Sequence, residues 1–395
     1  MNVVRPRFRS GFGFTLIELM VAIGMSAVVA VGMYALSLVA SQTFQQQQRI
    51  SEVQMRVRSA MEMLRADIAR AGYMASPATA TDPMVCPRPA VAMQAIYARR
   101  DNPNPTHEAA SNLFISPARI ELVGNFTSSD VYRVMAISGR TVYLQNRTAA
   151  YARFANESVF EQVFENQFVQ ITGSNGMSQT VQVTDAEWTA PGSASLPYLE
   201  LAAAPVVIGA GGAGCGIPGL GVGATIAPVS GIAYRVVAGA NVFAEGVPTS
   251  TGRTDLVRET LAANAMGGFE SVAGSARVVA EYAVDLDVSV TVDTAVAGAP
   301  EPLLTRYEFG DARVFTVLAR SGAAGAAPER VRAVGLRLSV RERVQDPDFA
   351  WVARSAATDP LTRFRVFTNQ IGASRVRTLT TEVELPNIAF RNLRP

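Results

Sequence analysis

The stretch that decides the fold is Gly11-Phe-Gly-Phe-Thr-Leu-Ile-Glu-Leu-Met-Val-Ala-Ile-Gly-Met25, and the apolar run continues to Ala40. From Phe14 onward every residue of this run is apolar or small and uncharged, with the single exception of Glu18. About 20 such residues are enough to cross a bilayer as an α-helix. The sequence therefore predicts a membrane-spanning helix over residues 14–40.

The acid inside this span, Glu18, needs a physical explanation. A charged side chain within a hydrocarbon span costs roughly 2.5 to 3.5 kcal/mol on insertion scales, so an intramembrane acid is expected to have a function and a partner. The alternative is a tolerated interfacial carboxylate that reaches the lipid headgroups, because Glu18 lies only about one turn from the start of the span.

Three arginines, Arg5, Arg7 and Arg9, precede the span, and no acid accompanies them. The positive-inside tendency then keeps the N-terminus cytoplasmic and places everything after Ala40 on the far side of the membrane. A rival interpretation is a secretory signal that is cleaved near residues 39–41. Such signals have an apolar core of about 7 to 15 residues, which is much shorter than this run.

The segment Gly13-Phe14-Thr15-Leu16-Ile17-Glu18, after a short basic leader, resembles the class III signal of type IV prepilins and type II secretion pseudopilins. The resemblance implies that prepilin peptidase removes residues 1–13 by cutting between Gly13 and Phe14, and that the new terminal residue, Phe14, is N-methylated. It also implies that Glu18 pairs with the terminal amine of a neighbouring subunit during assembly. Such pairing removes much of the desolvation cost of an isolated buried charge.

Composition limits the remaining possibilities. The 395 residues include 35 basic and 33 acidic side chains, so removal of the three leader arginines leaves 32 against 33 and a nearly neutral protein. This balance gives no basic surface of the kind that binds nucleic acid.

The two cysteines, Cys86 and Cys215, both fall on the translocated side, where an oxidising compartment favours a disulfide between them. That bond would close a loop of roughly 130 residues and contribute about 4 to 5 kcal/mol in the chain-entropy account; two free thiols are the alternative.

Beyond Ala40 the helix is expected to continue as an amphipathic segment over residues 41–72. Its apolar residues recur at steps of three and four, which is the spacing of one helix face. They are Ile50, Val53, Val57, Met61, Leu64, Ile68 and Ala71. Gly72 is a plausible C-cap, so the whole helix would run from Phe14 to Ala71, on the order of 85 Å at 1.5 Å per residue. Residues 63–73 also resemble the end of this helix in PilW-type minor pilins.

The remaining chain, residues 73–395, reads as a β-rich domain. Alternating apolar residues bounded by turn residues predict strands. The expected strands are 119–123, 131–137, 141–146, 168–172, 180–184, 198–202, 278–292, 313–318, 334–341 and 379–385. A helix followed by strand after strand predicts an α+β fold in which a long N-terminal helix, membrane-spanning in its first half, packs on a C-terminal antiparallel sheet domain. This is a pilin-like arrangement, with a β-rich insertion expected at about residues 119–215.

Several segments match motifs of cofactor or metal sites, but the sequence around them lacks the other residues or elements that such sites need. Residues 206–214 match G-x-G-x-x-G, yet Cys215-Gly-Ile-Pro-Gly follows where a dinucleotide site needs a helix. Asp285 and Asp287 are expected on a solvated strand face, because a calcium site needs six or more oxygens. The single histidine, His107, has no second histidine to complete a metal pair. We therefore expect no metal, no cofactor and no catalytic residues.

These expectations combine into one functional prediction. The resemblance, which later segments such as residues 330–341 and 375–385 share more loosely, implies a PilW-like minor pilin that helps start filament assembly at or near the tip. The implied partners are other minor pilins, the major pilin, prepilin peptidase, the inner-membrane assembly platform and a tip adhesin. The implied location is the inner membrane, single-pass with a periplasmic domain, and then the pilus at the cell surface. A minor pseudopilin of type II secretion and a membrane-tethered periplasmic enzyme or ligand-binding module are the alternatives.

Overall fold

The computed structural model describes residues 15–391 apart from 90, 102–111, 113, 210–213, 239–252, 265–267, 297–298, 300, 357 and 368–370. It contains two compact units, residues 1–52 and residues 53–395. One helix, α1 (Leu16–Ala69), has residues in both units. The predicted cleavage residues Gly13 and Phe14, and the single histidine, His107, lie outside the described residues.

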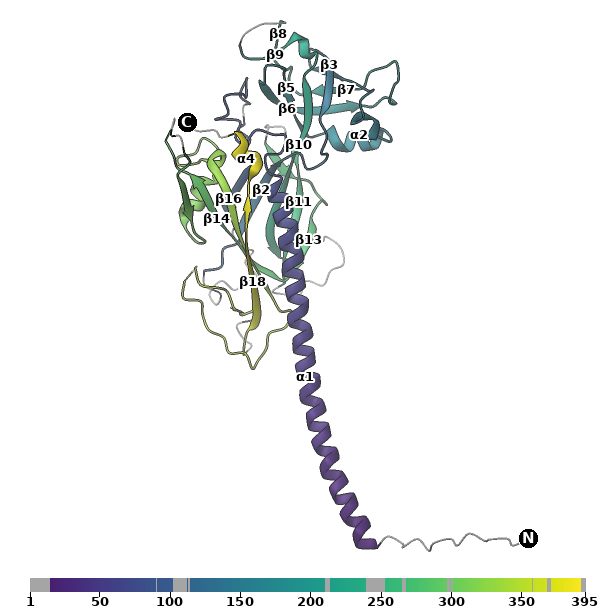
Figure 1. The fold of residues 1–395 in the computed structure, drawn as a ribbon, viewed down its shortest axis with the longest axis vertical. Helices are drawn as coiled ribbons and strands as arrows, with labels where there is room; N and C mark the ends of the chain where they lie inside the picture. Colours follow the sequence, from purple (N-terminus) through teal and green to yellow (C-terminus); the bar gives the residue numbers. More distant parts are fainter. Residues whose placement is uncertain are drawn as a thin grey trace, which may run out of the picture. The chain divides into compact units, whose positions relative to one another are not determined.

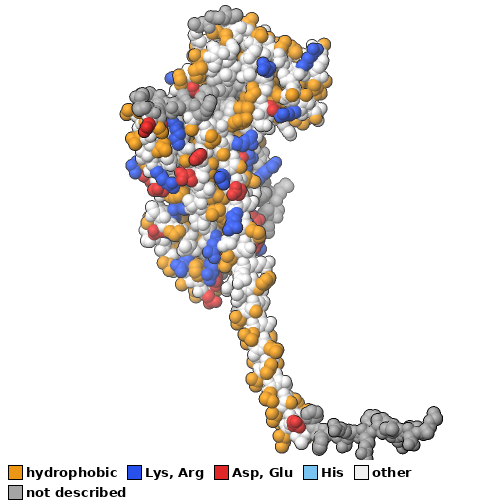
Figure 2. Space-filling view, in the orientation of Figure 1, with side chains coloured by type: hydrophobic (Ala, Val, Ile, Leu, Met, Phe, Trp, Pro, Cys, Tyr) orange, Lys and Arg blue, Asp and Glu red, His pale blue; other side chains and the backbone are white. Residues whose placement is uncertain are grey.

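In the first unit, α1 begins at Leu16, directly after Thr15, whose hydroxyl oxygen accepts the Glu18 N–H at 3.2 Å. Threonine is a favoured helix N-cap for this reason. The large apolar side chains from Leu16 to Phe44 are between 47% and 74% exposed. The helix has a mean hydropathy of 2.2 over its most apolar 18 residues, and none of these is buried. Figure 2 shows the hydrophobic side chains along this part of α1. This part of α1 is therefore long and apolar enough to cross a membrane, and it is not a buried core helix of the described chain.

In the second unit, the rest of α1 buries one apolar stripe. Val53, Val57, Met61, Leu64 and Ile68 are each at most 4% exposed, which confirms the predicted face of the helix. The helix ends at Ala69, slightly before the predicted residue, because the next N–H groups bond to carbonyls three residues back in a tightened last turn.

Two antiparallel sheets form the core of the domain around this stripe (Figure 1). The strands of the larger sheet nearest the helix are β1 (Ile96–Arg100), β2 (Ala118–Gly124), β10 (Thr225–Ala238), β11 (Thr254–Ala263), β12 (Phe269–Ser271) and β13 (Arg277–Glu281). The second sheet has the order β15 (Leu304–Tyr307), β14 (Ala283–Asp293), β16 (Val331–Arg341), β18 (Ser374–Glu384), β17 (Arg363–Phe364). Alternate apolar residues of both sheets and the α1 stripe share one hydrophobic cluster. The α+β fold predicted from the sequence is therefore confirmed.

The larger sheet continues into a second module with a hydrophobic cluster of its own. The elements of this module are β3 (Tyr132–Ser138), β4 (Thr141–Leu144), α2 (Glu157–Phe164), β5 (Phe168–Thr172), β6 (Ser178–Glu187) and β7 (Tyr198–Leu201). Strand β10 links the two cores: residues 225–229 pair with β5 and residues 230–238 pair with β2 and β11. A short parallel pair, β8 (Val207–Ile208) and β9 (Ile217–Pro218), lies beside this module (Figure 1).

Two sequence expectations are wrong in detail. Residues 278–292 form two strands, because the chain breaks at Tyr282 (φ +59°) and passes from β13 in the first sheet to β14 in the second. Residues 313–318 lie mostly in helix α3 (Ala312–Val317). Val314 and Val317 of this helix and Leu318 at its C-cap are buried and have the three-and-four spacing of a helix. The residues after the last strand, for which the sequence predicted no element, form helix α4 (Pro386–Arg391).

Candidate functional site

The first candidate site is the start of α1. Glu18 is exposed in the first helical turn, where a carboxylate is favoured by the helix dipole. In the described part of the chain, no side chain forms a hydrogen bond or ion pair with the Glu18 carboxylate. The Glu18 carboxylate has no partner among the described residues and lies on the exposed apolar part of α1, where a charged group of another molecule can reach it.

A second feature is the buried group that fastens the other end of α1 to the sheet. Tyr234 on β10 donates its hydroxyl to Asp67 Oδ2 at 2.7 Å, and Arg258 on β11 donates Nε to the same oxygen at 2.8 Å. Burial, and then the Asp67 charge, raise the pKa of the Tyr234 hydroxyl well above its usual value. Sequence reasoning did not identify this group, since its members are 167 and 191 positions apart and no local pattern connects them.

The predicted disulfide is present. Cys86 and Cys215 are bonded, with Cα atoms 5.3 Å apart and 129 positions of sequence between them. Cys86 also donates its N–H to the Ser178 carbonyl of β6 at 3.0 Å. The bond therefore ties the connection that follows α1 to the loop region beside β8 and β9. Pinning two long loops in this way restricts the unfolded chain far more than the folded one.

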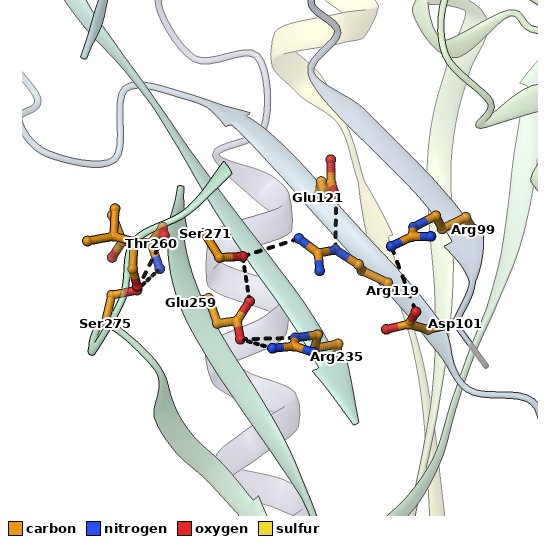
Figure 3. A network of polar contacts seen from close by, with 10 residues as sticks. Arg99, Asp101, Arg119, Glu121, Arg235, Glu259, Thr260, Ser271 and Ser275 are labelled. Carbon is orange, nitrogen blue, oxygen red and sulfur yellow. Dashed lines mark hydrogen bonds and ion pairs between the residues drawn. The ribbon is translucent and has the colours of Figure 1, made fainter. Parts of the chain in front are cut away.

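A network of charged side chains follows the outer face of the first sheet (Figure 3). Arg119 on β2 donates to Glu121 at 2.9 Å, and Arg235 on β10 donates Nε to Glu259 on β11 at 2.9 Å. Ser271 on β12 joins the two pairs, accepting from Arg119 and donating to Glu259. Burial alone would raise the pKa of Glu259, but the hydrogen bonds from Arg235 and Ser271 hold it below its usual value. Because the charges of this network neutralise one another, we assign the network a structural role.

The prediction that Asp285 and Asp287 lie on a solvated strand face is wrong. They are 3% and 2% exposed, respectively. Asp287 accepts from Arg337 at 2.8 Å and pairs with Arg100 at 3.2 Å, while Asp285 lies 3.9 Å from Arg354. Burial, and then the neighbouring Asp287 charge, raise the pKa of Asp285 to about 7.

The segment between β16 and β18 buries these acids. Its residues Leu361, Phe364 and Val366 form a cluster with Val284 of β14. The group thus has a perturbed carboxyl but is covered, so it is a buried ionic cluster rather than an open catalytic site. Among the described residues there is also no group of three or more His, Cys, Asp or Glu arranged to hold a metal ion.

The glycine-rich segment was predicted not to be a dinucleotide site. Part of it, residues 210–213, lies outside the described residues. Cys215 is followed by β9 and a 3₁₀ turn, Gly219–Gly221. A pyrophosphate site of this type needs a helix N-terminus directly after the glycines, and the described residues that follow do not form one.

Comparisons with known proteins bear on the first of these sites. The family model of the prokaryotic N-terminal methylation motif matches residues 9–34. A solved type IV-like pilin from Thermus thermophilus is similar at 13% identity over 56% of this chain and 85% of that chain, with a TM-score of 0.17. That value is too low to support an argument. No curated protein matches the chain.

Proposed function

We propose that this chain, a protein of the type IV prepilin family by its N-terminal methylation motif, is a minor pilin that helps initiate assembly of a type IV pilus and lies at or near its tip. The observation that carries the proposal is the exposed apolar helix with a single acid in its first turn and no partner for that acid in the described chain. Isolated, this arrangement is costly; in a bundle of identical or related helices it supplies both apolar contact and a charge pair.

The chemistry of maturation would supply the partner. Hydrolysis of the peptide bond between Gly13 and Phe14 by prepilin peptidase would release the basic leader and create a free amine at Phe14, which then carries the methyl group. An ammonium from one subunit and the Glu18 carboxylate of its neighbour form an ion pair that is strong in a low-dielectric helix bundle. Each added subunit would therefore satisfy an acid that its neighbour leaves unpaired.

The partners follow from this mode of assembly. Before cleavage the protein would be held in the inner membrane with its domain in the periplasm, in reach of the peptidase and the assembly platform. After cleavage its helix would pack with those of other minor pilins and the major pilin, with a tip adhesin above them. The disulfide between Cys86 and Cys215 suits an oxidising extracytoplasmic compartment.

The deciding experiment is mass spectrometry of the mature N-terminus. We expect a chain that begins at N-methylated Phe14. A chain that retains Arg5 to Arg9, or one that begins near Ser41, would contradict the proposal, because neither could present an amine next to Glu18.

A second experiment tests the role of the acid. Glu18→Ala should reduce the amount of the protein in sheared filaments, while membrane insertion and folding of the domain remain unchanged. Glu62→Ala, which removes an exposed acid further along the same helix, is the matched control and should assemble normally. Normal assembly of Glu18→Ala would refute the pairing.

A type II secretion pseudopilin would have the same N-terminal chemistry and is the second candidate. Deletion of the gene separates the two, because loss of pili supports our proposal and loss of exoprotein release with normal pili supports the alternative.

A further inference from the structure

The outer edge of β6 has a gap in its hydrogen bonding. Strand β6 pairs with β5 along residues 178–182, and Val183 donates its N–H to the Gln167 carbonyl at 2.8 Å. Because backbone groups of successive residues in a strand point to opposite edges, those of residues 178, 180 and 182 point away from β5. These are the groups available to a further strand.

Other segments of the chain occupy this edge on both sides of Thr180: residues 84–86 lie beside Ser178, and Ala202 and β7 lie beside residues 182–187. Ser178 donates to the Met84 carbonyl at 2.7 Å and accepts from Cys86, and the Gln182 carbonyl accepts from Ala202 at 2.9 Å. Between these bonds, the N–H and C=O of Thr180 and the N–H of Gln182 have no hydrogen-bond partner among the described residues. The open edge therefore offers a donor, an acceptor and a second donor in sequence.

The chain itself explains why the gap is not closed. Pro87 and Pro89 follow Cys86, and a proline has no N–H to give to a neighbouring strand. On the other side, the backbone of Val206 is bound by the side chain of Gln179, which accepts its N–H at 2.8 Å and donates to its C=O at 2.7 Å. In the described part of the chain, neither flanking segment forms a backbone hydrogen bond with Thr180.

A groove of about 360 Å³ lies beside the open edge. Its lining is mainly apolar and includes Pro87, Val91, Phe168 and Ala203, together with Thr180 itself. One wall is held in place, since Cys86 immediately precedes Pro87 and is bonded to Cys215. An apolar groove beside unpaired backbone groups is the arrangement by which sheets bind an added strand.

One charge lines the groove. Arg88 is exposed on the wall between the two prolines and has no carboxylate partner among the described residues. A ligand with a carboxylate at this point would form an ion pair with Arg88. At an exposed site such a pair adds little binding energy, but it favours a negatively charged ligand over a positively charged one.

We propose that this groove binds an extended peptide segment of another protein, which adds as a short strand beside Thr180, places small apolar side chains in the groove and directs a carboxylate to Arg88. This inference does not depend on the proposed assembly function. It would give the domain a docking site separate from the helix contacts of the first unit.

The test uses the full chain in detergent micelles and a fluorescein-labelled probe peptide, acetyl-Val-Thr-Val-Thr-Glu-Val-amide. We expect saturable binding, with slowed hydrogen exchange at the amides of Thr180 and Gln182. Replacement of the glutamate by glutamine in the probe should weaken binding to the wild type, but not to Arg88→Ala. No binding of the probe, or protection located elsewhere in the chain, would overturn the proposal.

Two variants at one position separate backbone pairing from side-chain contact. Thr180→Pro removes the donor at an edge position where proline is tolerated, and it should reduce affinity about fivefold to tenfold, the value of one hydrogen bond. Thr180→Val keeps the N–H and should bind like the wild type. Equal binding by all three proteins would refute strand addition.

A lowered midpoint of thermal unfolding would show that Thr180→Pro misfolds. A second set of probe peptides therefore tests strand pairing with the wild-type protein alone. Probe peptides methylated on alternate backbone nitrogens differ only in which edge of the added strand keeps its donors. One methylation pattern should abolish binding to the wild type and the other should leave it unchanged. Equal effects of both patterns would contradict the pairing.

Discussion

Substitution of the buried acid Asp285 by asparagine should stabilise the domain at pH 8 and have little effect at pH 4. Asp285 is 3% exposed, and its Oδ1 has no hydrogen-bond partner among the described residues. Its other oxygen lies 3.9 Å from Arg354, which is too long for a hydrogen bond. The neighbouring Asp287 takes the closer contacts with Arg337 and Arg100. The ionised form of Asp285 is therefore poorly compensated.

The magnitude follows from the pKa. Burial, followed by the charge of Asp287, raises the pKa of Asp285 to about 7, whereas an unfolded aspartate titrates near 3.9. The folded state then keeps this proton longer than the unfolded state, so stability is full below about pH 4 and is lost as the pH rises toward about 7. Three pH units correspond to about 4 kcal/mol. An asparagine avoids this loss, and we expect Asp285→Asn to be about 2 to 4 kcal/mol more stable than the wild type at pH 8.

The assay is denaturant unfolding of the full chain in detergent, followed by the fluorescence of Trp188 and Trp351 at pH 4 and pH 8. Asp287→Asn is the matched control: it leaves Arg337 buried without its carboxylate and should lower the free energy of unfolding at pH 8 by on the order of 3 kcal/mol. A loss of stability for Asp285→Asn at pH 8, or the same gain at both pH values, would refute the reasoning.

Three further substitutions test the other contacts by the same unfolding assay. Tyr234→Phe removes the 2.7 Å hydrogen bond to Asp67 and should cost about 1 to 3 kcal/mol, because that bond involves a charged acceptor. Cys215→Ser removes the bond to Cys86 and should cost about 4 kcal/mol in the chain-entropy account, with reduction of the wild type giving the same loss. Gly124→Ala would bring a Cβ within 2.9 Å of a backbone carbonyl oxygen at the end of α1 and should cost about 1 to 3 kcal/mol; a neutral result would mean that this contact relaxes freely.

The sequence predicts best those features that depend on the spacing of nearby residues or on residue type alone. The buried stripe of α1, from Val53 to Ile68, follows directly from a period near 3.6, and the packed face needs no knowledge of its partner. The disulfide was predictable from compartment and number, because two cysteines in an oxidising location have a single pairing.

The failures have a common physical cause. Alternation along residues 283–293 showed which side chains share a face of the strand, but it carried no information on what covers the second face. The covering segment lies between β16 and β18, about 70 positions away in the chain, and it supplies Arg354 to the buried acids. The same limit explains α3, since six residues are too few to distinguish a strand from a helix by period alone.

The distribution of satisfied and unsatisfied charges indicates where binding energy is available. In the domain, Asp67, Glu259 and Asp287 each have an arginine partner within 3 Å, so a new neighbour would have to break an existing pair to use them. From Leu16 to Phe44 the large apolar side chains are exposed, and Glu18 has no partner in the described chain. A partner that used these three acids would therefore bind weakly, whereas we expect apolar contact and a charge pair to favour association through the exposed part of α1. Under the proposed function, the helix would hold a subunit in the filament, and the groove beside Thr180 would select its neighbour.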